Sequence, residues 1–216
     1  MRATLSTIVL LLGTFNPDLL AQSQPSGWGP KAATKALDLA IVYAPERAKT
    51  VNTTSNYFWF QGAAADAAFT FYSGLGIAAT LTGQTASNLR NKGSVSKISY
   101  LIGPRYTLDT SHAMGNEIGA LGGSTLFGEA LFGGIHGFNG AFPAALRTTP
   151  TANSLAYQFG GGCDLTLARG FALRIVEVDY FHSGLPNQGS GTQSDLRLGF
   201  GVSYHMSKRR IHFRTQ

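Results

Sequence analysis

The chain has 216 residues and a formal net charge of +6, yet only 13% of its residues are charged and 27 are glycine. Soluble domains usually carry about a quarter charged residues. No stretch of 18 or more apolar residues is present, which excludes a membrane-spanning helix. Such a chain could enter a membrane only as a closed β-barrel, in which every backbone group is paired within the protein.

Residues 1–21 have the features of a secretory signal peptide. Arg2 precedes an apolar run at 8–12, and Ala21 offers a cleavage point. Residues 22–36 are rich in Ser, Gly, Pro and Ala and are interpreted as a flexible lead-in. The sequence therefore predicts an exported protein.

Residues 37–205 contain about eight segments in which an apolar or aromatic residue recurs at every second position. A period of two is that of a β-strand whose two faces meet different surroundings. Pro104 predicts a bulge, and a second bulge near Ile175–Val176 would place Arg174, Glu177 and Asp179 on one face. The predicted strands are 37–43, 57–72, 75–82, 96–108, 125–137, 154–167, one beginning at 171, and 196–205.

The connections alternate in length. Tight turns are expected at Ser73–Gly74 and Ala168–Gly170, and 109–124 is either an insertion or an extra strand. Long polar loops are expected at 44–57, 84–95, 137–153 and 182–194. Short periplasmic turns and long outer loops are typical of transmembrane barrels. We predict an all-β fold, a transmembrane antiparallel β-barrel of about eight strands in an up-and-down meander, with its long loops outside and its basic tail, 206–216, in the periplasm.

Charged residues recur on the face opposite the apolar one. In a barrel of about eight strands this face lines an interior that side chains fill, so its charges must pair or stay hydrated. A plug that braces the barrel is favoured over a transport path. The predicted lumen charge network consists of Asp66, Arg105, Glu129, Asp164, Arg174, Glu177 and Arg197.

Aromatic residues lie near the ends of the predicted strands on the apolar face. Tyr and Trp favour the membrane–water interface, where they form the two girdles of a barrel. The predicted interface aromatics are Tyr43, Trp59, Phe71, Tyr72, Tyr100, Tyr106, Tyr157, Phe171 and Tyr204.

Sequence motifs for catalysis or for cofactor or metal binding are weak in this chain. His182–Ser183 with nearby carboxylates leaves an outer-membrane acyl hydrolase as a minor alternative, but no catalytic, cofactor-binding or metal-binding residue is assigned. The run 160–162 enters a strand and is not a phosphate loop. Cys163 is the only cysteine, so no internal disulfide can form. Apart from the basic tail, nothing favours nucleic acid.

Five stretches stand out: 57–62 (YFWFQG), 102–106 (IGPRY), 126–131 (LFGEAL), 136–139 (HGFN) and 196–201 (LRLGFG). They resemble the small OmpA-like, porin-family outer-membrane β-barrel domain proteins of Gram-negative bacteria. The resemblance implies an integral outer-membrane barrel with periplasmic termini and no catalytic residues. The expected partners of the protein are outer-membrane lipids, lipopolysaccharide, the barrel-assembly machinery and an unknown external ligand.

The expected function is therefore a structural or surface-interaction role without an open pore. The alternatives are a small-solute porin and a soluble exported lipocalin-like binder.

Overall fold

The computed structural model describes residues 31–32, 36–49, 57–89, 93–110, 123–143, 148–168, 170–186 and 191–207. The predicted signal peptide, most of the lead-in, the interior of 109–124 and the basic tail from residue 208 lie outside these residues.

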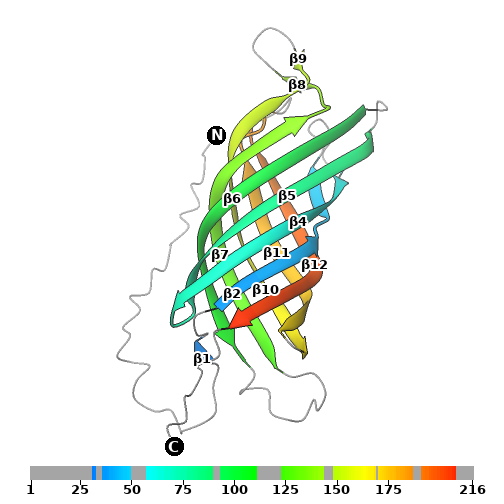
Figure 1. The fold of residues 1–216 in the computed structure, drawn as a ribbon. Coiled ribbons are helices and arrows are strands. Elements are labelled where there is room, and N and C mark those ends of the chain that lie inside the picture. The colour runs from blue at the N-terminus through cyan, green and yellow to red at the C-terminus, as the bar shows by residue number, and fades with distance from the viewer. Residues whose placement is uncertain are drawn as a thin grey trace, which may run out of the picture.

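Eight antiparallel strands close into a single ring, with each strand pairing with the next along the chain (Figure 1). The last strand pairs with the first, from Phe200 opposite Tyr43 to Ser207 opposite Ala36, which closes the barrel. The predicted all-β up-and-down barrel is confirmed. The ring consists of β2 (Ala36–Tyr43), β4 (Tyr57–Tyr72), β5 (Leu75–Leu89), β6 (Gly93–Asp109), β7 (Ser124–Phe138), β10 (Ala152–Ala168), β11 (Phe171–Ser183) and β12 (Gln193–Ser207).

Four short strands accompany the ring. β1 (Lys31–Ala32) pairs with β6, and β8 (Phe142–Pro143) pairs with β9 (Thr148–Thr149) beyond one end of the barrel. β3 (Glu46–Lys49) continues the line of β2, since both pair with β4 and β12.

The first barrel strand is interrupted at Ala44–Pro45 rather than ended there. Proline has no N–H to donate, so regular pairing stops at this residue. The backbone still bonds on both sides: Ala44 N donates to Gly62 O at 2.9 Å, and Leu198 N donates to Pro45 O at 2.9 Å. The prediction that a loop begins at residue 44 is therefore wrong.

The predicted loop 84–95 is also wrong, because β5 and β6 extend through most of it and leave only 90–92 between them. Gln84 and Ala86 are buried on the inner face, whereas Thr85 is exposed outside. This part of the sheet lacks large apolar outer residues, so the apolar alternation fades there although the strand continues.

The predicted connections at 137–153, 182–194, Ser73–Gly74 and Ala168–Gly170 agree with the observed strand ends, whereas the two alternatives for 109–124 stay predictions. The strand ends that flank 90–92, 139–151 and 184–192 lie at one end of the barrel, and the tight turn at Ser73–Gly74 and the close approach of β10 and β11 between Ala168 and Phe171 lie at the opposite end. Ser73 and Gly74 have φ of 41° and 85°, the pair of positive values that a two-residue type I′ hairpin turn requires. We call the two ends the loop end and the turn end.

One of the two predicted bulges is present. The register between β11 and β12 shifts between Arg174 and Glu177, leaving Ile175 and Val176 both exposed outside. No register shift occurs at Pro104, which pairs with Ile77 and faces outward. The missing Pro104 N–H is accommodated without an extra residue, so that bulge prediction is wrong.

The distribution of apolar and polar side chains is the reverse of that in a soluble protein. Large apolar side chains lie outside, with Ile41 72% and Ile102 59% exposed, whereas the buried inner face is mostly small, polar or charged. Among the described residues, no helix is long and apolar enough to cross a membrane. An exposed apolar surface of this extent argues against the soluble lipocalin-like alternative.

Candidate functional site

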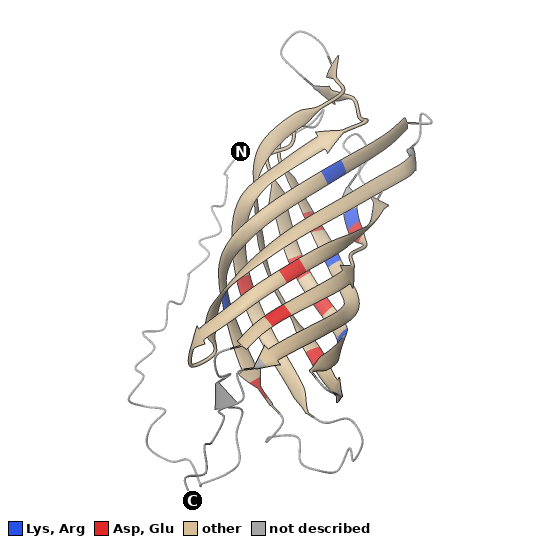
Figure 2. Cartoon of the chain, viewed as in Figure 1, with Lys and Arg blue, Asp and Glu red and all other residues tan. Residues whose placement is uncertain are grey.

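Figure 2 marks the charged positions along the ribbon, and nearly all of those on the eight ring strands have side chains buried in the barrel interior. Burying charges there costs free energy unless they pair or form hydrogen bonds. The partners of these side chains therefore determine how much they stabilise or destabilise the folded barrel. The acidic residues are Asp38, Glu46, Asp66, Glu129, Asp164, Glu177, Asp179 and Asp195, and the basic ones are Lys97, Arg105, Arg174 and Arg197.

The loop-side cluster consists of Glu46, Lys97, Asp195 and Arg197. Glu46 is fully buried, accepts a hydrogen bond from Lys97 Nζ and is 3.0 Å from Arg197 Nη2. Lys97 Nζ is also 4.0 Å from Asp195 Oδ2. The Phe181 ring lies 4.4 Å from the Arg197 guanidinium carbon and 5.2 Å from Lys97 Nζ. Two carboxylates thus meet two cations.

The turn-side cluster is organised by Arg174, which is 1% exposed. Its Nε donates to Asp164 Oδ1 at 2.9 Å, and its Nη1 donates to Asp66 Oδ2 and Glu177 Oε2, each at 2.7 Å. Charge-assisted hydrogen bonds of this kind are the strongest that side chains make. One guanidinium therefore ties β4, β10 and β11 together across the lumen.

Two further groups complete the turn-side cluster. Arg105 Nη1 is 3.7 Å from Glu129 Oε2, and the guanidinium carbons of Arg105 and Arg174 lie 3.6 and 4.4 Å from the Phe127 ring centroid. His205 Nδ1 is 2.7 Å from Asp38 Oδ1. We define the turn-side cluster as Asp38, Asp66, Arg105, Glu129, Asp164, Arg174, Glu177, Asp179 and His205.

Gln158 joins the two clusters. Its Nε2 donates to Glu129 Oε1 at 3.2 Å, and its Oε1 accepts from Arg197 Nη1 at 2.8 Å. An apolar core lies in the same interior, with Leu131 and Phe181 at 0% and Ile135 at 1% exposed. The lumen is therefore filled by side chains and does not form an open pore.

The structure brings part of the predicted network together. Asp66, Asp164 and Glu177 meet at Arg174, and Arg105 lies beside Glu129. Arg197 lies in the other cluster, where its carboxylate partner is Glu46.

Sequence reasoning missed Glu46 because this residue fell within a predicted loop. The sequence of 46–49, Glu-Arg-Ala-Lys, carries no apolar alternation, so no clear sequence signal marked the strand beyond Pro45.

The predicted interface aromatics all lie on the outer face, exposed or half-buried, in two groups. Near the turn end, Phe171 packs against Tyr204 with ring centroids 4.8 Å apart, and Tyr72 precedes the turn at Ser73–Gly74. Phe71 and Tyr106 belong to this group. Tyr43, Trp59, Tyr100 and Tyr157 lie further toward the loop end.

The minor hydrolase alternative is not supported at its proposed residues. Ser183 is 1% exposed and points inward, whereas the adjacent His182 points outward and stacks on Tyr157 with ring centroids 4.7 Å apart. Consecutive strand residues face opposite sides of a sheet, so these two side chains cannot act together.

Comparison with known proteins identifies the fold. No protein-family model and no curated protein matches the chain. Among solved structures, Ail, the attachment invasion locus protein of Yersinia pestis, matches with a TM-score of 0.51 and 14% identity over 81% of this chain and 100% of Ail. Neisserial surface protein A matches with a TM-score of 0.51 and 8% identity over 79% of this chain and 97% of that protein. The chain thus has the fold of the eight-stranded outer-membrane β-barrels.

Proposed function

We propose that this outer-membrane-type barrel is an integral surface protein of a Gram-negative bacterium, with a structural or attachment role and neither a channel nor a catalytic activity. The observation that carries the proposal is the filled lumen. Buried Arg174, Gln158 and Phe181 occupy the space that a porin leaves to water. The regions that remain available for contact with other molecules are the outer surface and the loop end.

The outer surface matches the dimensions of a bilayer. Trp59 and Phe71 are twelve residues apart on β4, which corresponds to about 40 Å along a strand, or about 30 Å across a membrane at a tilt of about 40°. The hydrocarbon core of a bilayer is about 30 Å thick. This agreement supports the assignment of the two aromatic groups to the two membrane interfaces and of outer-membrane lipids as partners.

The loop end is basic, which supports an anionic partner. The chain carries no Asp or Glu in 47–59, 87–96, 138–155 or 183–194. The cations within the same ranges are Arg47, Lys49, Arg90, Lys92 and Arg147. Lipopolysaccharide presents phosphate groups at this surface, and Ail, which shares the fold, is an attachment invasion locus protein. We therefore assign lipopolysaccharide as the first partner of the loop end.

The partner assignment is tested with purified protein in detergent on lipopolysaccharide-coated wells. Replacing Arg47, Arg90, Lys92 and Arg147 together by Gln should weaken binding at least tenfold, and binding by the unchanged protein should fall with added salt. Replacing Lys31, which lies opposite Asp109 near the turn end, together with Lys35 by Gln is the control and should leave binding unchanged. Equal binding by both variants would refute the assignment.

The location and orientation are tested in cells. The protein should fractionate with the outer membrane after signal-peptide cleavage, should need detergent for extraction, and should migrate differently on gels with and without heating. Trypsin added to intact cells should cut after Lys49, Lys92 or Arg147 and spare Lys208–Arg210. Release by osmotic shock, or cleavage confined to the tail, would contradict the proposal.

A further inference from the structure

The turn-side cluster contains more negative than positive side chains. The cluster holds six carboxylates but only two arginines, Arg105 and Arg174. The loop-side cluster has equal numbers of both. The six carboxylates are those of Asp38, Asp66, Glu129, Asp164, Glu177 and Asp179.

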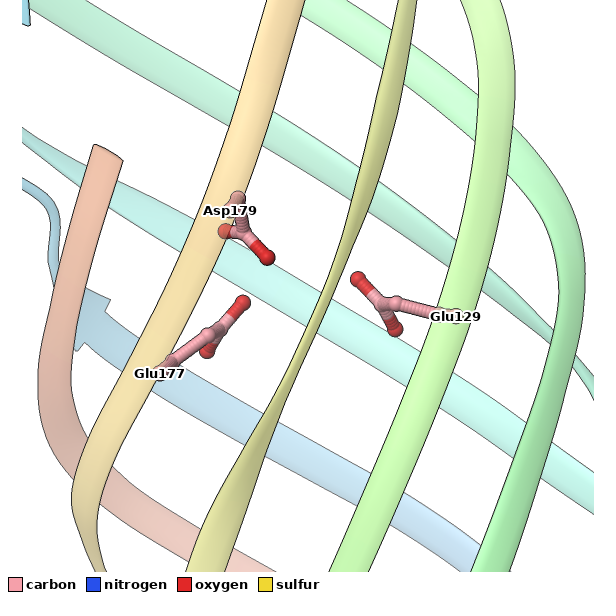
Figure 3. Close-up of side chains that lie close together, drawn as sticks. All are labelled: Glu129, Glu177 and Asp179. Carbon is pink, nitrogen blue, oxygen red and sulfur yellow. The ribbon is translucent and has the colours of Figure 1, made fainter. Parts of the chain in front are cut away.

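The excess is concentrated at three side chains. Glu177 and Asp179 project from β11 and Glu129 from β7, and Figure 3 shows the three carboxylates gathered across β10. One oxygen from each lies within 4.8 Å of the other two. Glu177 also contacts Arg174, and Glu129 is near Arg105 only at 3.7 Å.

Asp179 has no cationic side chain as a partner among the described residues. It is 1% exposed, and its Oδ1 is buried without a hydrogen-bond partner. No lysine or arginine among the described residues lies within ion-pair distance of it. A buried carboxylate oxygen of this kind costs free energy unless a proton or a cation neutralises it.

The sheet leaves room at this point. Gly160 pairs with Glu129 on one side and with Asp179 on the other. A Cβ at residue 160 would stand 1.9 Å from Asp179 Oδ1. Glycine is therefore required for the carboxylates to approach one another over β10.

We propose that Glu129, Glu177 and Asp179 bind one calcium ion inside the barrel. Calcium takes oxygen ligands at about 2.3–2.6 Å, so two ligands on opposite sides of the ion lie up to about 5 Å apart. Three oxygens within 4.8 Å of one another can surround an ion of this size after small side-chain shifts. Magnesium demands near-ideal octahedral geometry and usually keeps several waters, so a buried set of three carboxylates suits it less well than calcium. The bound ion would cross-link β7 and β11 and supply the positive charge that the turn-side cluster lacks.

The test uses the full-length mature protein, refolded in detergent with or without calcium chloride and then freed of excess ion. Equilibrium dialysis with radioactive calcium should give one saturable site per chain, and calcium should raise the melting temperature relative to a chelator. Asp179→Asn should weaken calcium binding at least tenfold. Gly160→Ala, which keeps every charge but projects a methyl group onto Asp179 Oδ1, should weaken it as well.

Asp195→Asn is the matched control. Asp195 is also a buried lumen carboxylate with an oxygen lacking a hydrogen-bond partner, but it belongs to the balanced loop-side cluster. This variant should bind calcium as the unchanged protein does. The proposal is overturned if the unchanged protein shows no saturable binding, as expected if the three carboxylates share protons instead. It is equally overturned if Asp179→Asn and Asp195→Asn bind calcium alike.

Discussion

The loop-side and turn-side clusters occupy one lumen but differ in how their charges are balanced. Glu46 has two cationic partners, Lys97 and Arg197, whereas Arg174 alone serves three carboxylates. Removing one partner of a buried pair is costlier than the pair's net contribution, because the other charge is left buried. The free energy of unfolding should thus depend most on those cations whose carboxylate partners have no second cation nearby.

The largest effect is expected for Arg174→Met. The change removes the hydrogen bonds to Asp66, Asp164 and Glu177 and leaves Arg105 as the only arginine in the turn-side cluster. We expect the free energy of unfolding to fall by about 3–5 kcal/mol. Urea titration in lipid vesicles, followed by tryptophan fluorescence, measures it. A loss below that of Lys97→Met would remove the distinction between the clusters.

A smaller loss is expected for Arg105→Met. Its Nη1 lies 3.7 Å from Glu129 Oε2, too far for a good hydrogen bond, and its Nε has no partner. The guanidinium still supplies charge and packs on Phe127. A decrease of about 2–3 kcal/mol in the same titration is expected. No change would mean that water solvates Glu129.

Lys97→Met probes the balanced cluster. Arg197 remains bonded to Glu46 after the change, and a methionine can still pack near Phe60 and Phe181. We expect a loss of about 1–2 kcal/mol. The double change of Lys97 and Arg197 to Met should cost clearly more than the sum of the two single changes, since it leaves Glu46 alone. Additive losses would show that the two cations do not substitute for each other.

The smallest effect is expected outside the barrel. Arg47 is exposed at the loop end, where its guanidinium carbon lies 3.8 Å from the Tyr57 ring centroid. Arg47→Met should lower the free energy of unfolding by less than about 1 kcal/mol. A loss as large as that of Lys97→Met would show that the loop end braces the barrel.

Sequence alone predicted the membrane-facing part of the fold. The exposed outer residues of β12, such as Leu196 and Phe200, alternate with buried ones such as Arg197, because lipid and lumen impose opposite demands on neighbouring positions. The alternation weakened where β5 continues past Gln84, since small and polar residues occupy both faces there. The end of β5, the start of β6 and the loop 84–95 were mispredicted for that reason.

Sequence could indicate which charges face inward, but not their partners. Arg197 and Glu46 are 151 positions apart in the sequence. They meet because the strand register of the closed barrel places them at the same height along the barrel axis. The bulge after Arg174 was predictable because it reconciles Arg174 with Glu177 and Asp179 on one face. Signal-peptide cleavage and the role of the basic tail remain predictions.

The most direct test of a closed, lumen-filled barrel is conductance in planar lipid bilayers. The purified, heat-modifiable protein is inserted at known density, and current is recorded over both signs of voltage, with an open porin as positive control. The side chains that fill the interior predict no stable conductance steps above the bare bilayer. Large, reproducible, ion-selective steps would contradict the account and identify the protein as a pore.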